Sequence, residues 1–282
     1  GPRLVRSLAS AERTPGWPWN RWLLGPGCDG LLCVSEGAVE THRRMRGGRP
    51  IARAPGAVEA ERLMPVSAWD GAREARAMRA GLGVAEDAPL IGVVARIQRH
   101  RRFDLLLAAM QRLVRRRPDA RLVVIGRGTH AEEVARAPVR RLGLEAQVVF
   151  AGYRISDYAA LLRALDVFCF LVPGSDGSCR ALLEAATIGL PLVGSRRGAI
   201  PEIIRDGVTG RLVEEDPDQL AEVWRALLSD PIRRRAWGLA AARDARLRFA
   251  PERLAEAVED FYETLAAGPS GEESSWTPTS SR

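Results

Sequence analysis

The chain of 282 residues is long enough for one large or two ordinary domains, and its 46% of apolar residues excludes a disordered protein. The longest apolar runs, such as 165–172, are too short to span a bilayer, and no apolar leader is present, so we expect neither a transmembrane helix nor a signal peptide. The net charge is +7, but all 42 basic residues are arginine and do not interleave with aromatic residues. We therefore expect no nucleic-acid partner, and an anionic membrane is the alternative partner for this charge.

Residues 1–70 are predicted to form a partial amino-terminal Rossmann-like domain. Apolar runs at 3–10, 29–36 and 49–57 each indicate a strand, and residues 36–46 indicate a helix. The chain begins Gly1-Pro2 without an initiator Met, which we interpret as a truncated or processed start.

Residues 71–250 are predicted to form a complete domain in which strands and helices alternate. Strands are expected at 89–97, 120–126, 147–152, 166–173, 191–195 and 210–214. The intervening helices are expected at 103–116, 131–143 with a break at Pro138, 156–164 capped by Ser156 or Asp157, 181–189 ended by Gly189, and 199–204. This alternation predicts an α/β fold with a doubly wound parallel sheet.

The carboxyl-terminal part is predicted to hold an amphipathic helix over 251–267 and a disordered polar tail over 268–282. The four cysteines lack the spacing of metal ligands, so we expect no metal site and a reducing, cytoplasmic location. The three histidines, His42, His100 and His130, are expected at the surface.

Ligands of doubly wound sheets bind at the carboxyl ends of the strands, where the loops 96–101, 126–128, 153–154 and 174–178 should meet. Arg96 closes a strand and Arg101 precedes a helix, so their two guanidinium groups suit a diphosphate. A plain basic loop in an arginine-rich chain is an equally good interpretation of these two residues.

The stretch SDGSCRALLEAATIGLP, residues 175–191, places Asp176 and Glu184 around the start of a helix. Ser178 or Asp176 is expected to cap that helix, whose free N–H groups favour phosphate, and Gly177 lets a ligand approach the backbone. Glu184 leans back toward the helix start and suits the hydroxyls of a ribose. A capped helix with an incidental Glu is the alternative interpretation.

Six ordered stretches together resemble the retaining family 4 glycosyltransferases of GT-B fold, also described as glycosyl transferases group 1. They are DGLLCVSE (29–36), APGAVEAERLMP (54–65), VARIQRHRRFD (94–104), VVIGRG (123–128), SDGSCRALLEAATIGLPLVGS (175–195) and AIPEIIRDGVTGRLVEEDP (199–217). The resemblance covers residues 3 to 265 and implies two Rossmann-like domains, of which the amino-terminal one is truncated here.

The resemblance implies roles for residues that match the family's motifs. Arg96 and Arg101 would hold the diphosphate of a nucleoside-diphosphate sugar, Glu184 would accept the ribose hydroxyls, and Asp176 would contact the transferred sugar. Arg154 would lie against the base. The N–H groups of the segment Gly177, Ser178, Cys179, Arg180, Ala181 and Leu182 would face the sugar and the phosphates.

The implied reaction transfers a sugar from a UDP- or GDP-sugar to a glycan or lipid-linked acceptor of the bacterial cell surface. It retains the anomeric configuration and uses no cofactor and no metal. The chain departs from the family in having Asp176 in place of Glu and Arg101-Arg102 in place of Lys-Gly.

Three alternatives stay open at this point. Another GT-B enzyme, such as a sugar-nucleotide epimerase, is disfavoured by the order of the six motifs. A sugar-nucleotide-binding remnant without turnover follows if the truncated amino-terminal domain is required for activity. A peripheral position at the inner face of the membrane is the alternative to a freely cytoplasmic one.

Overall fold

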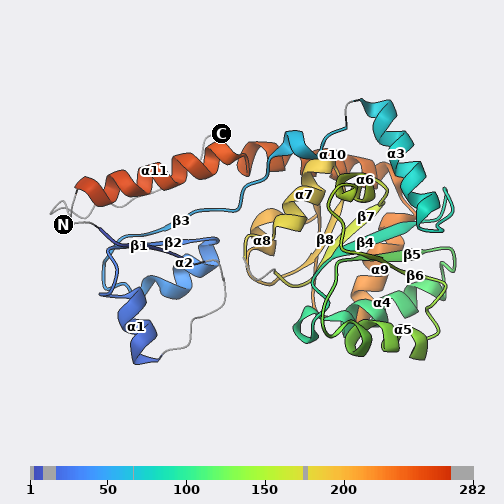
Figure 1. The fold of residues 1–282 in the computed structure, drawn as a ribbon, viewed down its shortest axis with the longest axis horizontal. Coiled ribbons are helices and arrows are strands. Elements are labelled where there is room, and N and C mark those ends of the chain that lie inside the picture. The colour runs from blue at the N-terminus through green and yellow to red at the C-terminus, as the bar shows by residue number, and fades with distance from the viewer. Residues whose placement is uncertain (1–2, 9–16, 66, 174–176, 268–282) are drawn as a thin grey trace.

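The computed structural model describes residues 3–8, 17–65, 67–173 and 177–267, which form two parallel β-sheets (Figure 1). The strands are β1 (Val5–Leu8), β2 (Gly30–Cys33), β3 (Ile51–Arg53), β4 (Leu90–Val94), β5 (Arg121–Ile125), β6 (Val148–Gly152), β7 (Val167–Phe170), β8 (Leu192–Ser195) and β9 (Gly210–Val213). Each of them lies within its predicted range. The strand orders are β1-β2-β3 in one sheet and β6-β5-β4-β7-β8-β9 in the other, which confirms the predicted α/β class with parallel Rossmann-like sheets.

Helices connect and cover these strands. They are α1 (Pro18–Leu24), α2 (Glu36–Arg43), α3 (Ala68–Gly81), α4 (Phe103–Val114), α5 (Ala137–Arg141), α6 (Tyr158–Arg163), α7 (Arg180–Ile188), α8 (Ile200–Ile203), α9 (Pro217–Leu228), α10 (Pro231–Arg248) and α11 (Pro251–Ala267), with a 3₁₀ turn η1 (Ala60–Leu63) and a π-helical turn η3 (Glu132–Arg136). The domain boundaries proposed at residues 70, 250 and 267 stay a prediction.

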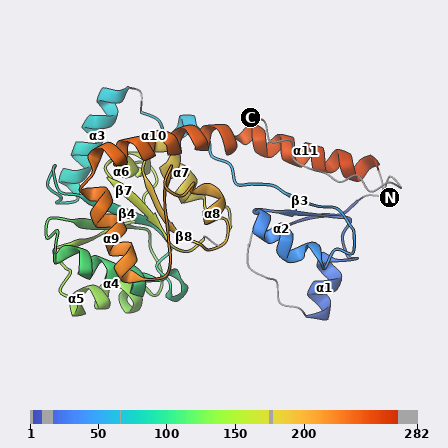
Figure 2. The same cartoon turned by 180° about the vertical axis from the view of Figure 1, so that it is seen from behind.

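The six-stranded sheet has a hydrophobic layer on each face because successive strand residues point to opposite sides. Leu90 belongs to the layer formed with α6, α7 and α10, whereas Ile91 belongs to the layer formed with α4 and α9 (Figures 1 and 2). Both residues are fully buried. Helices on both faces are the reason that the strands are apolar along their whole length.

The three-stranded sheet packs against α1 and α2 on one face and α11 on the other (Figure 1). Arg46, only 1% exposed, lies beside this sheet, and its guanidinium donates to the carbonyl oxygens of Leu24, Gly25, Cys28, Asp29 and Pro50 at 2.6–3.3 Å. A single buried side chain therefore joins the end of α1 to the segments that precede β2 and β3.

The surface prediction is wrong for His42. This side chain is fully buried on α2, and its Nδ1 lies 2.8 Å from the Ala38 carbonyl oxygen, one helical turn earlier. His100 is exposed and His130 is partly exposed, as expected. The helix thus places its one histidine on the face that packs on the sheet.

The predicted break at Pro138 is a widened turn instead. The π-helical turn η3 runs directly into α5, and the Ala137 N–H donates to the Glu132 carbonyl five residues earlier. Proline has no N–H and its ring clashes with the carbonyl four residues earlier. A wider turn relieves that clash without ending the helix.

A Gly-Arg-Gly turn, residues 126–128, ends β5 against the loop that follows β4. Gly126 has a φ of +139°, and a Cβ placed there would lie 2.1 Å from the Ala95 carbonyl oxygen. We expect Gly126→Ala to lower the free energy of unfolding by roughly 2–3 kcal/mol, because backbone must move and the backbone conformation is strained. Urea denaturation measures this, with Gly143→Ala as a control at positive φ but in open space; equal losses in both variants would contradict the close-approach argument.

Among the residues that the structure describes, no helix has both the length and the apolar character needed to cross a membrane.

Candidate functional site

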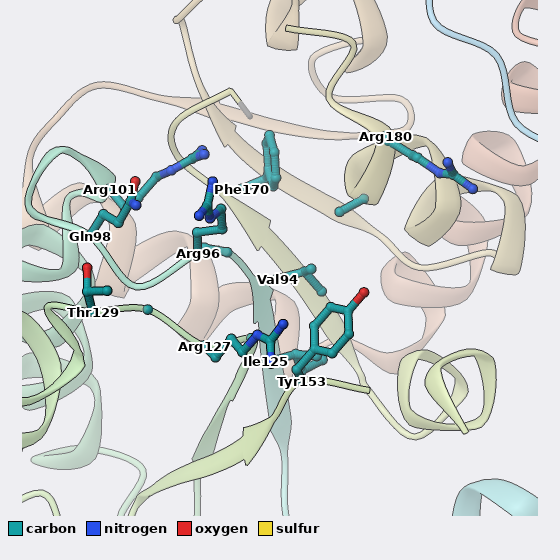
Figure 3. Close-up of a pocket in the computed structure, with 14 residues that line it drawn as sticks. Val94, Arg96, Gln98, Arg101, Ile125, Arg127, Thr129, Tyr153, Phe170 and Arg180 are labelled. Carbon is teal, nitrogen blue, oxygen red and sulfur yellow. The ribbon is translucent and has the colours of Figure 1, made fainter. Parts of the chain in front are cut away.

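A cavity of about 660 Å³ lies at the carboxyl ends of β4, β5, β6 and β7 (Figure 3). Loops after these strands form its walls, and the start of α7 closes one side. Its lining residues are Val94, Ala95, Arg96, Gln98, Arg101, Ile125, Gly126, Arg127, Gly128, Thr129, Tyr153, Phe170, Arg180 and Ala181. Parallel strands bring these loops to one edge, as expected for a doubly wound sheet.

Arg96 and Arg101 lie on the same side of the cavity (Figure 3). Arg96 is exposed, and within the described ranges it makes no hydrogen bond or ion pair. Arg101 is only 9% exposed, and its Nη1 donates to the carbonyl oxygens of Val172, at 3.1 Å, and Pro173. Arg101 therefore anchors the loop after β7, while Arg96 contributes a charge to the cavity that no described residue pairs with.

The helices α4 and α7 both begin at the cavity after a residue in the left-handed conformation. Arg102 has a φ of 55° and Cys179 a φ of 54°, the two non-glycine residues with positive φ among those described. Glycine adopts such a φ without strain, so the glycine that the resemblance led us to expect at this position would fit the backbone better than Arg102 does. Ion pairs to Asp104 and Glu215 hold the Arg102 side chain away from the cavity.

Cys179, and not Ser178, is the N-cap of α7, and no side chain caps the helix in the described region. The expected cap by Ser178 is therefore wrong, because the left-handed Cys179 backbone turns the chain before the first helical turn. Asp176, the other predicted cap and the predicted sugar contact, lies outside the described residues. Gly177 is buried and described, next to the helix start.

Glu184 lies on α7 with its side chain 13% exposed. The Tyr158 hydroxyl donates to its Oε2 at 2.8 Å, and the Arg180 Nε donates to its Oε1 at 2.9 Å. Burial raises the pKa of Tyr158 well above its usual range, and the adjacent Glu184 carboxylate adds to the effect. Tyr158 therefore stays a hydrogen-bond donor at every physiological pH and fixes the orientation of the carboxylate.

Arg154 does not line the cavity. Its Nε donates to the Ala151 carbonyl at 2.8 Å and its Nη1 to Asp157 at 2.7 Å, so it closes the turn between β6 and α6. Asp157 is the N-cap residue of α6 but makes no side-chain cap, because its carboxylate binds Arg154, and the cap expected from it is wrong. Tyr153, one residue earlier, faces the cavity instead, and the Arg127 guanidinium lies 4.9 Å from its ring centre.

Of the predicted binding residues, Arg96, Arg101, Arg180 and Ala181 line the cavity. Gly177, Ser178, Cys179 and Glu184 lie beside it, at the start and in the second turn of α7. The sequence interpretation missed Tyr153 and Arg127, although both stand in the strand-end loops named as the site. A cavity with cationic walls and one aromatic face suits an anion that carries a planar ring.

The cavity lies in the segment that matches a family model, "Glycosyl transferases group 1", over residues 74–244. The chain is 27% identical to a GDP-mannose-dependent monoacylated alpha-(1-6)-phosphatidylinositol monomannoside mannosyltransferase of Corynebacterium glutamicum, over 86% of this chain and 64% of the relative. It is 33% identical to the GDP-mannose-dependent alpha-(1-6)-phosphatidylinositol monomannoside mannosyltransferase of Mycolicibacterium smegmatis, over 66% of this chain and 49% of that one. A D-inositol 3-phosphate glycosyltransferase of Corynebacterium kroppenstedtii is 33% identical over 68% of this chain and 44% of its own.

Solved structures share the fold. Anabaena HepE, determined in complex with UDP-glucose, superposes with a TM-score of 0.78 at 20% identity, over 94% of this chain and 72% of that one. Sucrose-phosphate synthase from Thermosynechococcus elongatus gives a TM-score of 0.74 at 20% identity, over 94% and 68%. The chain thus spans about half to three quarters of the length of the proteins it resembles. Because the family model matches well over half of it, the chain belongs to the glycosyl transferases group 1 family.

Proposed function

We propose that the chain is the donor-binding part of a retaining family 4 glycosyltransferase that transfers a sugar from a nucleoside-diphosphate sugar without a metal ion. The observation that carries this proposal is the cavity at the carboxyl ends of β4 to β7, with the exposed Arg96 and the buried Arg101 on one side. Two guanidinium groups offer bidentate contacts to phosphate oxygens.

The donor's parts are assigned along the cavity. Arg96, Arg101 and the N–H groups at the start of α7 hold the diphosphate, and Glu184 accepts the ribose hydroxyls. Tyr153, with Arg127 over its ring, stacks on the base in place of Arg154. Asp176 contacts the transferred sugar. In this arrangement the cations stabilise the charge of the departing diphosphate, which is the role a metal ion has in other transferases.

The relatives support a sugar-nucleotide donor and suggest an acceptor class. Two are named as GDP-mannose-dependent enzymes acting on phosphatidylinositol mannosides, and Anabaena HepE was determined with UDP-glucose. We propose a UDP- or GDP-sugar as donor and a lipid-linked or inositol-containing acceptor.

We expect Arg96→Ala to weaken binding of UDP or GDP about tenfold or more, because a charge-assisted contact to phosphate contributes about 1.5–3 kcal/mol. The Arg96 side chain has no partner in the described structure, so its removal leaves the fold intact. Isothermal titration calorimetry with a panel of nucleoside diphosphates measures the effect, and Arg235→Ala on the exposed face of α10 is the matched control.

Failure of every nucleotide to bind the parent chain would rule out the donor-site proposal. Binding without hydrolysis or transfer of the sugar would instead favour the sugar-nucleotide-binding remnant. In that case, hydrolysis or transfer should appear only when the chain is extended by the amino-terminal residues that the remnant lacks.

A further inference from the structure

Three exposed tryptophans lie on the helix α1 and at its N-cap position, which is Trp17. Trp17, Trp19 and Trp22 are 72%, 67% and 51% exposed, and the rings of Trp19 and Trp22 stack with centres 5.3 Å apart. Positions i and i+3 share one face of a helix, so the pair forms a continuous apolar surface. Clustered exposed aromatic side chains mark an interaction site, since burial is their usual state.

Packing fixes the outward direction of these rings. Leu24, at the end of α1, is 3% exposed in the core of the three-stranded sheet. The buried Arg46 donates to the Leu24 and Gly25 carbonyls, and the Gly25 N–H donates to the Arg21 carbonyl. The face of α1 that carries Leu24 is therefore held against the sheet, and the face that carries Trp19 and Trp22 is exposed to solvent.

Arginines lie in α1 and are concentrated in the segment that meets its end. Residues 17–28 and 43–50 contain five arginines and no acidic residue, and the two segments meet where a Cβ on Gly25 would lie 2.9 Å from the Met45 carbonyl oxygen. Arg21, Arg44 and Arg49 are exposed. The neighbouring carboxylates are engaged, since Glu36 and Glu40 pair with Arg43 and Asp29 accepts from the Leu4 N–H.

We propose that Trp17, Trp19 and Trp22, together with Arg21, Arg44 and Arg49, form a surface that docks on an anionic lipid bilayer. Tryptophan rings settle at the boundary between headgroups and acyl chains, and arginines beside them pair with lipid phosphates. A second copy of the chain fits poorly, because it would bring the same positive charges face to face. The surface is separate from the donor cavity, so either proposal can fail without the other.

Co-sedimentation of the full chain with phosphatidylcholine vesicles, with and without phosphatidylglycerol, tests the proposal. We expect binding that requires phosphatidylglycerol and falls as salt is raised. The double variant Trp19→Ser/Trp22→Ser should lower the partition constant about tenfold or more, and Arg44→Ala/Arg49→Ala about tenfold, because each removes one of the two contributions. Trp69→Ser is the matched control, since Trp69 is 68% exposed on α3.

Thermal unfolding is expected to be the same in all four proteins, because the replaced side chains are exposed. Absence of binding to anionic vesicles overturns the proposal, as does an equal loss in Trp69→Ser. Self-association of the parent chain that the double tryptophan variant abolishes would also overturn it, because the surface would then be a protein contact.

Discussion

Arg46→Met is expected to lower the free energy of unfolding of the three-stranded sheet by about 3–5 kcal/mol, because buried carbonyl oxygens lose the guanidinium that donates to them. Arg46 donates to five carbonyl oxygens from the segments around α1 and β2. Methionine fills a similar volume but donates nothing, so the buried Leu24, Gly25 and Cys28 carbonyl oxygens would lose this donor, whereas the Pro50 oxygen would keep the Leu31 N–H. Hydrogen exchange of peptides that cover β1 to β3, together with urea denaturation, measures the loss.

Two further variants make this test specific. Arg46→Lys keeps the charge but replaces the planar fork with a point donor, so we expect an intermediate loss. Arg49→Met removes an exposed arginine three residues away and should change stability by less than about 0.5 kcal/mol. If Arg46→Met is as stable as Arg49→Met, the buried guanidinium does not hold this part of the fold together.

Glu184→Ala is expected to weaken binding of a nucleoside diphosphate by about 10- to 100-fold, because hydroxyl groups that donate to a carboxylate contribute about 1.5–3 kcal/mol. The carboxylate is oriented by Tyr158 and shared with Arg180, so the ribose must displace or share these contacts. Glu184→Gln keeps the shape and one acceptor oxygen and should give an intermediate loss. Titration calorimetry measures all three proteins.

A ligand analogue isolates the ribose contact itself. A 2′-deoxynucleoside diphosphate should bind the parent chain about tenfold more weakly than its ribose counterpart, and this difference should vanish in Glu184→Ala. A difference that persists in Glu184→Ala would show that another residue reads the ribose. Such a result would leave the diphosphate contacts of Arg96 and Arg101 untouched, so the two claims are tested separately.

The strands were predictable because burial on both faces gives each one a continuous apolar run, as in 120–126 and 166–173. The loops that form the cavity were predictable as well, because they are the segments that directly follow the carboxyl ends of these strands. The capping residues at the helix starts were less predictable, because backbone conformation and ion pairs decided them instead of the preference of Ser and Asp for the N-cap position. Cys179 adopts a left-handed conformation ahead of α7, and Asp157 gives its carboxylate to Arg154.

Contacts between residues far apart in the sequence could not be predicted either. Nothing adjacent to Arg46 in the sequence distinguishes it from Arg43 or Arg44, and only the return of the chain around β2 surrounds it with carbonyl groups. The family resemblance implied Arg154, and not its neighbour Tyr153, as the residue beside the base. The strand and turn geometry instead direct the aromatic ring into the cavity.

The chain passes between its two sheets twice, once after β3 and once along α11, and the two passages touch ahead of α11, where the Val58 N–H donates to the Phe249 carbonyl oxygen at 2.9 Å (Figures 1 and 2). Two sheets joined by one connecting segment can rotate about any axis, whereas two connecting segments that touch at one point favour rotation about that point. An opening or closing of one sheet relative to the other that keeps this hydrogen bond would turn about the Val58–Phe249 pair, and it would have to break the contacts of Glu202 with Arg53 and with the Gly37 N–H. Displacements are then smallest beside that pivot and grow with distance from it, reaching their largest values at the far ends of the molecule.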